Sequence, residues 1–590
     1  MALAEALKDL VEKETKKNGP LAKIRDLHQR RRDLMALAPE KALDQILDAD
    51  NSVALVHAFS EQDFHLLVHD IGPEDALPLL SLASDKQWEY LVDAEVWDRD
   101  RLDLAAITRW FDLLHRSDPI RALRWLVEHK LELLEFYLFS NIEVRIREHD
   151  QDPSDFGKEW FSVDNHFYLR IIGDLSAEIS DLGEIDKDRF RQFLETLVHS
   201  LAAADHITYQ KILLEAVHII PAESEEEAYR QRNVRLAEKG FLPFEEAVGV
   251  YQALTAEQLM GTGHGRPRRS SGDTRLSITM YPAQLMQPKS EFTRALTRLD
   301  SAAAVERAQS EFAGLCNRLI AADCRKVKSR DDLQQVVRKA CGYLSIGLNE
   351  LASLPQERLP AKKAQSVELI QRYLMEDIFR VGYGRALRLK WRAQHWLKQA
   401  WFASKGLSLT FWGEAWLGVL GGVLLKKPLY FDNYRTATLY RDFETTEEIR
   451  EVDSVLQAII AVDDLLSLSR LDPQPLLSYR FLTYKNFLLT TWACDHLGLS
   501  GAPAPLSLPA FRKFYQQLWV PGSEPGQIRQ HMRESFLHWL ATQSGLREEQ
   551  ISANLAATLE SLFLELEDEY GPVKAKDLDP RFIQHFLIER

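Results

Sequence analysis

Cysteine is scarce in this chain. The 590 residues include four cysteines, and these are scattered: Cys316, Cys324, Cys341 and Cys494. They form no Cys-x-x-Cys pair, and no histidine stands near them at zinc-site spacing. This excludes a cysteine-based zinc site and predicts reduced, buried thiols in a cytosol.

Long apolar runs are also missing. The most membrane-like stretch is Ala415–Leu425, whereas crossing a bilayer takes about 20 apolar residues. We therefore expect a buried helix there and no membrane insertion. The N-terminal stretch MALAEALKDLVEKETKKNGP carries charges throughout and lacks the apolar centre of a secretory signal, so we expect a cytoplasmic protein.

Positive charge is in deficit. The formal net charge is −15 and the pI is about 5.7, which gives no global attraction to nucleic acid or to anionic lipid. Nucleic acid is therefore not a favoured partner, although a local basic face remains open.

Recognisable catalytic motifs are absent. The sequence contains no Walker loop, no nucleophile elbow and no Ser-His-Asp order beyond chance. Their absence does not exclude an enzyme, but it leaves no basis for naming a reaction, and no cofactor is expected.

Apolar residues three and four apart dominate what is present. This spacing predicts amphipathic helices, and strand-like alternation is rare, so we expect an all-α protein of several domains. The predicted organisation is an N-terminal superhelix of short helices, a second helical region, a flexible linker and a C-terminal helical bundle: residues 1–105, 106–260, 261–290 and 291–590.

A period of twelve residues runs through Phe59–Ala94. Ser60, Gly72 and Ser84 recur as candidate helix N-caps. Apolar residues follow each cap at offsets of four, seven and eight, which predicts three short helices with one buried stripe each. The stripe residues are Phe64, Leu67 and Val68, then Ala76, Leu79 and Leu80, then Trp88, Leu91 and Val92.

Two resemblances accompany these patterns. The stretch GPEDALPLL of the twelve-residue period resembles the cytosolic N-terminal superhelical domain of bacterial magnesium transporters. This resemblance implies a superhelical fold and a regulatory or docking role, but no transport. The passages Ser224–Leu254 and Leu374–Gln394 resemble an uncharacterised bacterial family of about this length. That resemblance covers most of the chain and implies a cytoplasmic bacterial protein without catalytic residues to carry over.

His65 and His69 stand four apart, the spacing at which two imidazoles on one helix can bind a metal ion. Leu66 occupies the position where a zincin has its glutamate, and the sequence names no third ligand. The favoured interpretation is therefore a pair of solvated surface histidines, and no metal site is predicted.

Three other stretches have functional and structural interpretations. Asp463 and Asp464 invite comparison with the magnesium-binding carboxylates of helical isoprenoid synthases, but no partner motif follows, so capping or solvation of a helix is favoured. The glycines of GTGHG at Gly261 follow a helix rather than a strand, which favours a linker over an anion site.

The third stretch is a possible interaction patch of arginines, in which Arg385, Arg388 and Arg392 lie three and four apart with tryptophans interleaved and Arg380 lies nearby. Its members are Arg380, Arg385, Arg388 and Arg392. Ion pairs across a helix bundle are the favoured interpretation, ahead of nucleic acid or an acidic partner.

These patterns favour a non-catalytic helical scaffold or regulatory protein that binds other proteins on superhelical surfaces. The alternatives are a helical enzyme with a magnesium-dependent site around Asp463 and Asp464, and a divalent-metal-responsive regulator using acidic residues such as Glu74 and Asp75.

Overall fold

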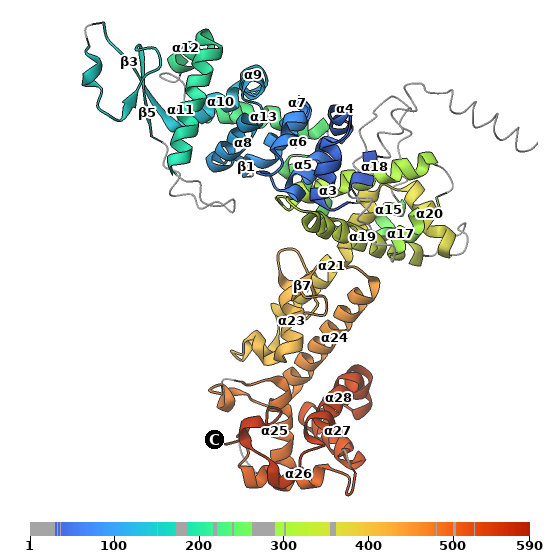
Figure 1. Ribbon diagram of the computed structural model, residues 1–590. Coiled ribbons are helices and arrows are strands. Elements are labelled where there is room, and N and C mark those ends of the chain that lie inside the picture. Colours follow the sequence, from blue (N-terminus) through green and yellow to red (C-terminus); the bar gives the residue numbers. More distant parts are fainter. Residues whose placement is uncertain are drawn as a thin grey trace, which may run out of the picture. The chain divides into compact units, whose positions relative to one another are not determined.

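The computed structural model describes residues 30–589, apart from 32, 36, 99, 150, 173–186, 216–220, 239–240, 262–289, 300–301, 355–361, 480, 500–502 and 524–525. Two compact units make up the chain (Figure 1). Unit 1 comprises the described residues of 1–252, 264–341 and 367–376, and unit 2 those of 253–263, 342–366 and 377–590. The predicted linker at 261–290, with its GTGHG run, lies almost wholly outside the described residues.

Helices dominate both units, which confirms the all-α prediction. The helices of unit 1 are α3 (Pro39–Leu47), α4 (Ser52–His57), α5 (Glu61–Ile71), α6 (Leu77–Leu82), α7 (Asp85–Glu95), α8 (Leu104–Ser117), α9 (Pro119–His129), α10 (Leu131–Asn141), α11 (Lys187–Ala204), α12 (His206–Glu215), α13 (Pro221–Glu238), α14 (Phe244–Ala247), α17 (Glu291–Leu296) and α18 (Ala302–Ala322).

Three further helices have residues in both units, and the remainder belong to unit 2. The shared helices are α19 (Arg330–Ser353), α20 (Lys362–Arg372) and α21 (Met375–Leu397). Unit 2 adds α15 (Ala256–Gly261), α22 (Trp401–Ser404), α23 (Gly413–Leu424), α24 (Thr446–Leu468), α25 (Tyr484–His496), α26 (Leu508–Leu518), α27 (Gln530–Ser544) and α28 (Glu548–Tyr570).

The twelve-residue period forms three separate helices, α5, α6 and α7. Ser60 caps α5 and Ser84 caps α7 with a complete capping box to Gln87. All nine predicted stripe residues are at most 1% exposed, so the predicted register of the buried face is confirmed. The winding of these helices into a superhelix remains a prediction.

The second predicted cap is wrong. Gly72 ends α5 with φ of +103°, a backbone conformation that glycine adopts without strain. The N-cap of α6 is Ala76, four residues later, so α6 is shorter than the pattern indicates. A turn over residues 73–76 separates the two helices.

A small antiparallel sheet in unit 1 was not expected from the sequence. Its strands are β3 (Ile142–Ile146), β4 (Trp160–Phe161) and β5 (Phe167–Ile171), in the order β3-β5-β4. Three successive residues of β5 are buried, because Phe167 packs on Tyr209 of α12 while Tyr168 stacks on Phe156. A strand covered on both faces does not alternate in polarity, so the pattern was hidden. Two-stranded hairpins add β1 (Trp97–Asp98) with β2 (Arg101–Leu102) in unit 1, and β6 (Tyr430–Phe431) with β7 (Tyr440–Arg441) in unit 2.

In unit 2, α19 and α21 cross with their backbones almost in contact. A Cβ at Gly382 would lie 1.9 Å from the carbonyl oxygen of Tyr343, and one at Gly347 would lie 2.1 Å from that of Ile378. Only glycine allows so close a crossing. The long helix α24 begins at a capping box of Thr445 and Glu448 and packs against α22, α23, α27 and α28.

Among the described helices, none is by itself both long and apolar enough to cross a membrane. One pair, Met375–Ser404 with Leu409–Leu424, meets the length and composition requirements jointly but is bent by 94°.

None of the four cysteines, all of which the structure describes, is in a disulfide. Cys316 and Cys341 are buried and Cys494 is partly buried, whereas Cys324 is exposed. The prediction of buried thiols is therefore wrong for Cys324, because this residue lies in a tight turn after α18 with φ of +49°.

Candidate metal centre

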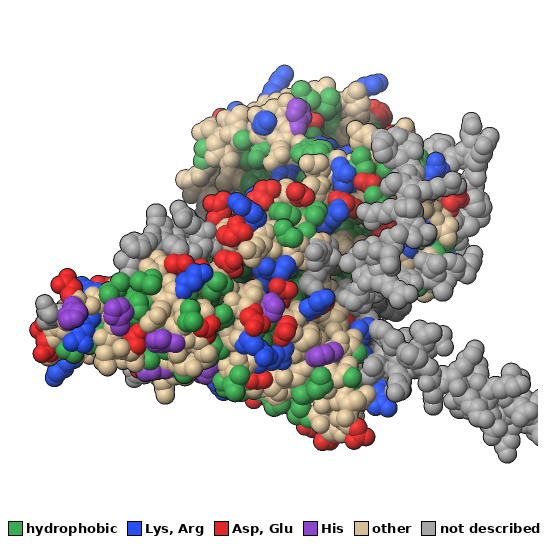
Figure 2. Space-filling view, turned by 90° about the horizontal axis from the view of Figure 1, so that it is seen from above, with side chains coloured by type: hydrophobic (Ala, Val, Ile, Leu, Met, Phe, Trp, Pro, Cys, Tyr) green, Lys and Arg blue, Asp and Glu red, His purple; other side chains and the backbone are tan. Residues whose placement is uncertain are grey.

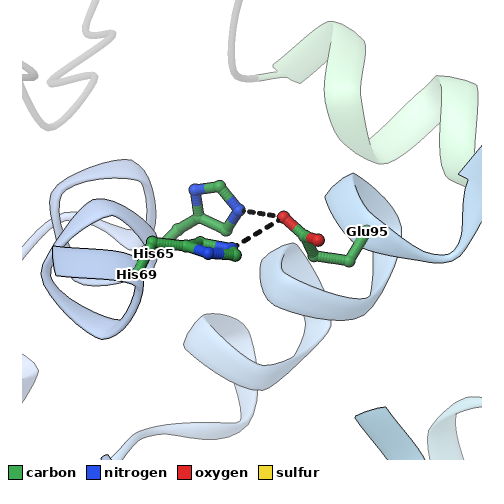
Figure 3. A group of neighbouring side chains, drawn as sticks. All are labelled: His65, His69 and Glu95. Atoms are coloured by element: carbon green, nitrogen blue, oxygen red, sulfur yellow. Dashed lines mark hydrogen bonds and ion pairs between the residues drawn. The ribbon is translucent and has the colours of Figure 1, made fainter. Parts of the chain in front are cut away.

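Two helices of the N-terminal region bring three candidate metal ligands together. The four-residue spacing of His65 and His69 places both imidazoles on one side of α5, and Glu95 reaches them from the last turn of α7 (Figure 3). The three ligand atoms lie within 4.8 Å of one another. Of the residues that the structure describes, these form the group suited to holding a metal ion.

One carboxylate oxygen joins the two histidines. Glu95 Oε1 lies 2.7 Å from His65 Nε2 and 2.9 Å from His69 Nε2. The two imidazole rings are 4.7 Å apart between centroids and meet edge to face. A carboxylate that bridges two imidazoles presents both Nε2 atoms and one oxygen to the same point in space.

The site is buried, so the interpretation of His65 and His69 as solvated surface residues is wrong. Both histidine side chains are 8% exposed and that of Glu95 is 4% exposed. The reason is the neighbouring aromatic packing: Tyr90 lies against His65 and Trp110 against His69, with ring centroids 5.7 Å and 5.8 Å apart.

Glu95 Oε2 is a buried oxygen without a hydrogen-bond partner in the part of the chain that the structure describes. Buried polar atoms are nearly always paired, and an exception calls for an explanation such as an ion. This oxygen is therefore an independent indication that the site accommodates a further group.

The electrostatics favour the ligand forms of the side chains. Burial lowers the pKa of His65, an effect that outweighs its hydrogen bond to Glu95. Burial by itself would raise the pKa of Glu95, but the hydrogen bonds from His65 and His69 hold that pKa well below its usual range. At neutral pH the site therefore offers an anionic carboxylate and a neutral His65 imidazole.

The donor set identifies the class of ion. Two imidazole nitrogens and one carboxylate suit zinc and its first-row neighbours, whereas magnesium and calcium prefer oxygen ligands. Zinc ligands at about 2.0–2.2 Å in a tetrahedron lie about 3.3 Å apart, so small side-chain rotations would bring the three atoms around one ion. Leu66 takes the place of a zincin's general base, and the arrangement does not point to peptide hydrolysis.

Glu95 was not predicted as a site residue, although its position in the sequence carries a signal. Glu95 follows Leu91 by four residues and Val92 by three, so it occupies the next position of the buried stripe of α7. A carboxylate at a buried stripe position requires a partner.

A network of ion pairs surrounds the last turn of α7. Asp93 lies 2.8 Å from Lys130 Nζ, with both side chains 4% exposed. Arg235 of α13 binds the same carboxylate at 2.7 Å, and Glu89 lies 3.3 Å from Arg235. Burial by itself would raise the pKa of Asp93, but the hydrogen bond from Arg235 and the charge of Lys130 lower it below its ordinary value.

Asp463 and Asp464 do not form a paired site. Asp463 is buried and accepts hydrogen bonds from Trp396 Nε1 at 3.0 Å and from the backbone amides of Trp401 at 2.9 Å and Phe402 at 3.1 Å. Asp464 is exposed. Burial raises the pKa of Asp463, and its role in the structure is to hold the start of α22.

The four arginines of the possible interaction patch have carboxylate partners within unit 2. The ion pairs are Arg380 with Asp377 at 3.2 Å, Arg385 and Arg388 with Glu350 at 3.0 Å each, and Arg392 with Asp453 at 2.7 Å. A partner for this patch remains a prediction. On the face shown in Figure 2, acidic and basic side chains are interspersed rather than gathered by sign.

The acidic residues Glu74 and Asp75 are both exposed. Glu74 pairs with Arg116 at 2.7 Å and Arg189 at 3.7 Å. Its charge is therefore offset by protein cations, which disfavours a metal ion at that position.

Comparison with known proteins identifies the family. The model of a family of unknown function, DUF6178, matches residues 19–589, nearly the whole chain. The chain belongs to this family, as the second resemblance indicated. No curated protein and no solved structure matches it, and the resemblance to magnesium transporters remains without support from these comparisons.

Proposed function

We propose that this protein is a divalent-metal-responsive helical protein whose N-terminal helices bind one zinc-class ion through His65, His69 and Glu95. The observation that supports this most directly is the convergence of two imidazoles on a buried carboxylate whose second oxygen has no hydrogen-bond partner among the described residues. A regulatory role for metal was one of the alternatives that the sequence left open; the ligands now proposed differ from the acidic residues considered there.

Binding at this site is proposed to be reversible. Both histidines hydrogen-bond to Glu95, and α5 and α7 share a buried apolar face. Helices that are held together by these contacts do not need an ion for folding, unlike the zinc fingers, which unfold without metal. Metal occupancy can then follow metal availability.

The test is calorimetric titration of the metal-free full chain with zinc, and separately with magnesium. We expect one zinc ion per chain and no heat of binding with magnesium. His69→Ala should abolish zinc binding, whereas the control His206→Ala, at an exposed histidine of α12, should bind as the wild type does. Equal zinc binding by the two variants, or no binding by the wild type, would refute the proposal.

The scaffold function, the protein partners and the cytoplasmic location remain predictions from the sequence. A metal-responsive protein would act on such partners through the metal-loaded form. Affinity purification from cells with zinc and with a chelator would test this, and identical sets of bound proteins would count against it.

A further inference from the structure

Helix α13 contacts the chain on both sides of Glu95. The guanidinium of Arg235 binds both carboxylate oxygens of Asp93, at 2.7 Å and 2.9 Å. Arg232 donates to the backbone carbonyl of Asp93 at 2.9 Å and lies over the ring of Trp97 at 5.3 Å. The residues two before and two after Glu95 are therefore both held by arginines of one distant helix.

The attachment of α13 extends to the hairpin that follows α7. Glu225 accepts a hydrogen bond from the backbone amide of Leu102 at 2.7 Å, and Tyr229 packs against Trp97 with ring centroids 5.5 Å apart. These contacts are polar or aromatic and come from a helix whose sequence, PAESEEEAYRQRNVRLAE, has few apolar residues. Because α13 also packs along α10, these named side chains account for its attachment to the end of α7 and the hairpin, not for its docking as a whole.

Glu95 has no comparable support of its own. Among the residues that the structure describes, its side chain has hydrogen bonds to the two histidines alone, through one oxygen, so its position depends on where the last turn of α7 lies. Metal coordination tolerates errors of only about 0.5 Å in ligand position. If the last turn of α7 is already held in place, metal binding loses less free energy to ordering that turn.

We propose that Arg232 and Arg235 are positioning residues for the metal centre, and that docking of α13 and metal binding favour each other. This rests on the proposed metal-binding function. Because coupling between two equilibria is reciprocal, zinc also stabilises the docked α13, and the metal state of the α5–α7 site is transmitted to a helix that contributes no ligand.

The first experiment compares zinc affinity in two variants of the full chain. Arg235→Ala removes the bidentate contact with Asp93, whereas Arg230→Ala is the matched control, because the ion pairs of Arg230 within the described part of the chain are with Glu226 and Glu227 of its own helix. We expect Kd for zinc to rise about 5-fold or more in Arg235→Ala and to stay within about 2-fold in Arg230→Ala, with Arg235→Lys in between.

The second experiment measures hydrogen exchange of the wild-type peptide 221–238 with and without saturating zinc. Slower exchange with zinc is expected, and this measurement also decides the matter if Arg235→Ala fails to fold. An unchanged Kd in folded Arg235→Ala, or unchanged exchange in the wild type that binds zinc, would overturn the coupling and leave the metal site standing. A wild type that binds no zinc would refute the proposed function, and the coupling with it.

Discussion

Each unit contains a buried carboxylate on a helix, and the two are held differently. Asp463 in unit 2 accepts from two backbone amides and an indole. Glu95 in unit 1 accepts from two imidazoles on one oxygen and leaves the other without a hydrogen-bond partner among the described residues. Both are at most 3% exposed, so burial alone does not separate them.

The difference lies in what the partners can do. Amides at the start of α22 are fixed by the backbone and cannot bind a metal ion. Imidazoles can turn and can exchange a hydrogen bond to the carboxylate for a bond to a metal. A buried carboxylate is therefore a candidate site when its partners are themselves ligands, and a structural element when they are not.

The largest expected effect concerns the structural carboxylate. Asp463→Ala should destabilise the protein by about 2–4 kcal/mol, because it leaves two amides and an indole N–H buried without an acceptor. Urea unfolding followed by circular dichroism measures this. Asp464→Ala is the control and should stay within about 0.5 kcal/mol, since Asp464 is exposed. Equal losses of stability in Asp463→Ala and Asp464→Ala would show that the buried hydrogen bonds of Asp463 do not stabilise the protein.

Glu95→Gln should abolish stabilisation by zinc. In the wild type, zinc at 100 times its Kd is expected to add about 2.7 kcal/mol to the free energy of unfolding. An amide has no negative charge for the ion but can still accept a hydrogen bond from a histidine, so the metal-free variant should fold. Thermal melts with zinc and with a chelator measure the shift, and Asp464→Ala should keep it. A full zinc shift in Glu95→Gln would show that the ion binds elsewhere.

Another buried carboxylate, Glu135 of α10, has carboxylates as the charged groups with the largest effect on it. Burial, then the charges of Glu215 and Glu132, raise its pKa from 4.5 to about 7, against a smaller opposing effect of Lys211. Because the folded pKa lies above the unfolded one, stability should fall as the pH rises from about 4.5 to 7, where only the unfolded state ionises.

Glu135→Gln removes this ionisation. At pH 8 the variant should be more stable than the wild type by about 1–3 kcal/mol, and at pH 4 the two should be equal. Denaturant unfolding at both pH values tests it. A difference that does not change with pH would mean that Glu135 does not titrate as described.

The smallest effect is expected at the surface. Arg388 is 42% exposed in its side chain and shares Glu350 with Arg385, so Arg388→Ala should change the free energy of unfolding by no more than about 0.5 kcal/mol. A loss of more than about 1 kcal/mol of stability in the same unfolding assay would show that the exposed Arg388–Glu350 ion pair stabilises the protein more than a surface ion pair usually does.

The helical architecture could be predicted because its signals are local. The caps at Ser60 and Ser84 and the stripe from Phe64 to Val92 depend on residues a few positions apart, and the structure reproduces them. Gly72 failed as a cap because glycine serves either end of a helix, and its positive φ was not visible in the pattern.

The metal centre could be predicted only in part. The spacing of His65 and His69 is local and was recognised, whereas their burial depends on Tyr90 and Trp110 from other helices. Glu95 lies 26 residues beyond His69, and only the packing of α7 against α5 brings the two together. The hydrogen bonds of Arg235 to Asp93, which lies 142 residues earlier in the chain, have no signal in the sequence.

The two units are built from alternating segments of the chain, and this limits how the chain can be cut into working parts. The backbone passes between the units after residues 252, 263, 341, 366 and 376, five times in all. A break between residues 253 and 376 therefore divides both units, and a break elsewhere divides one of them, so no single cut yields the two units as separate, complete modules.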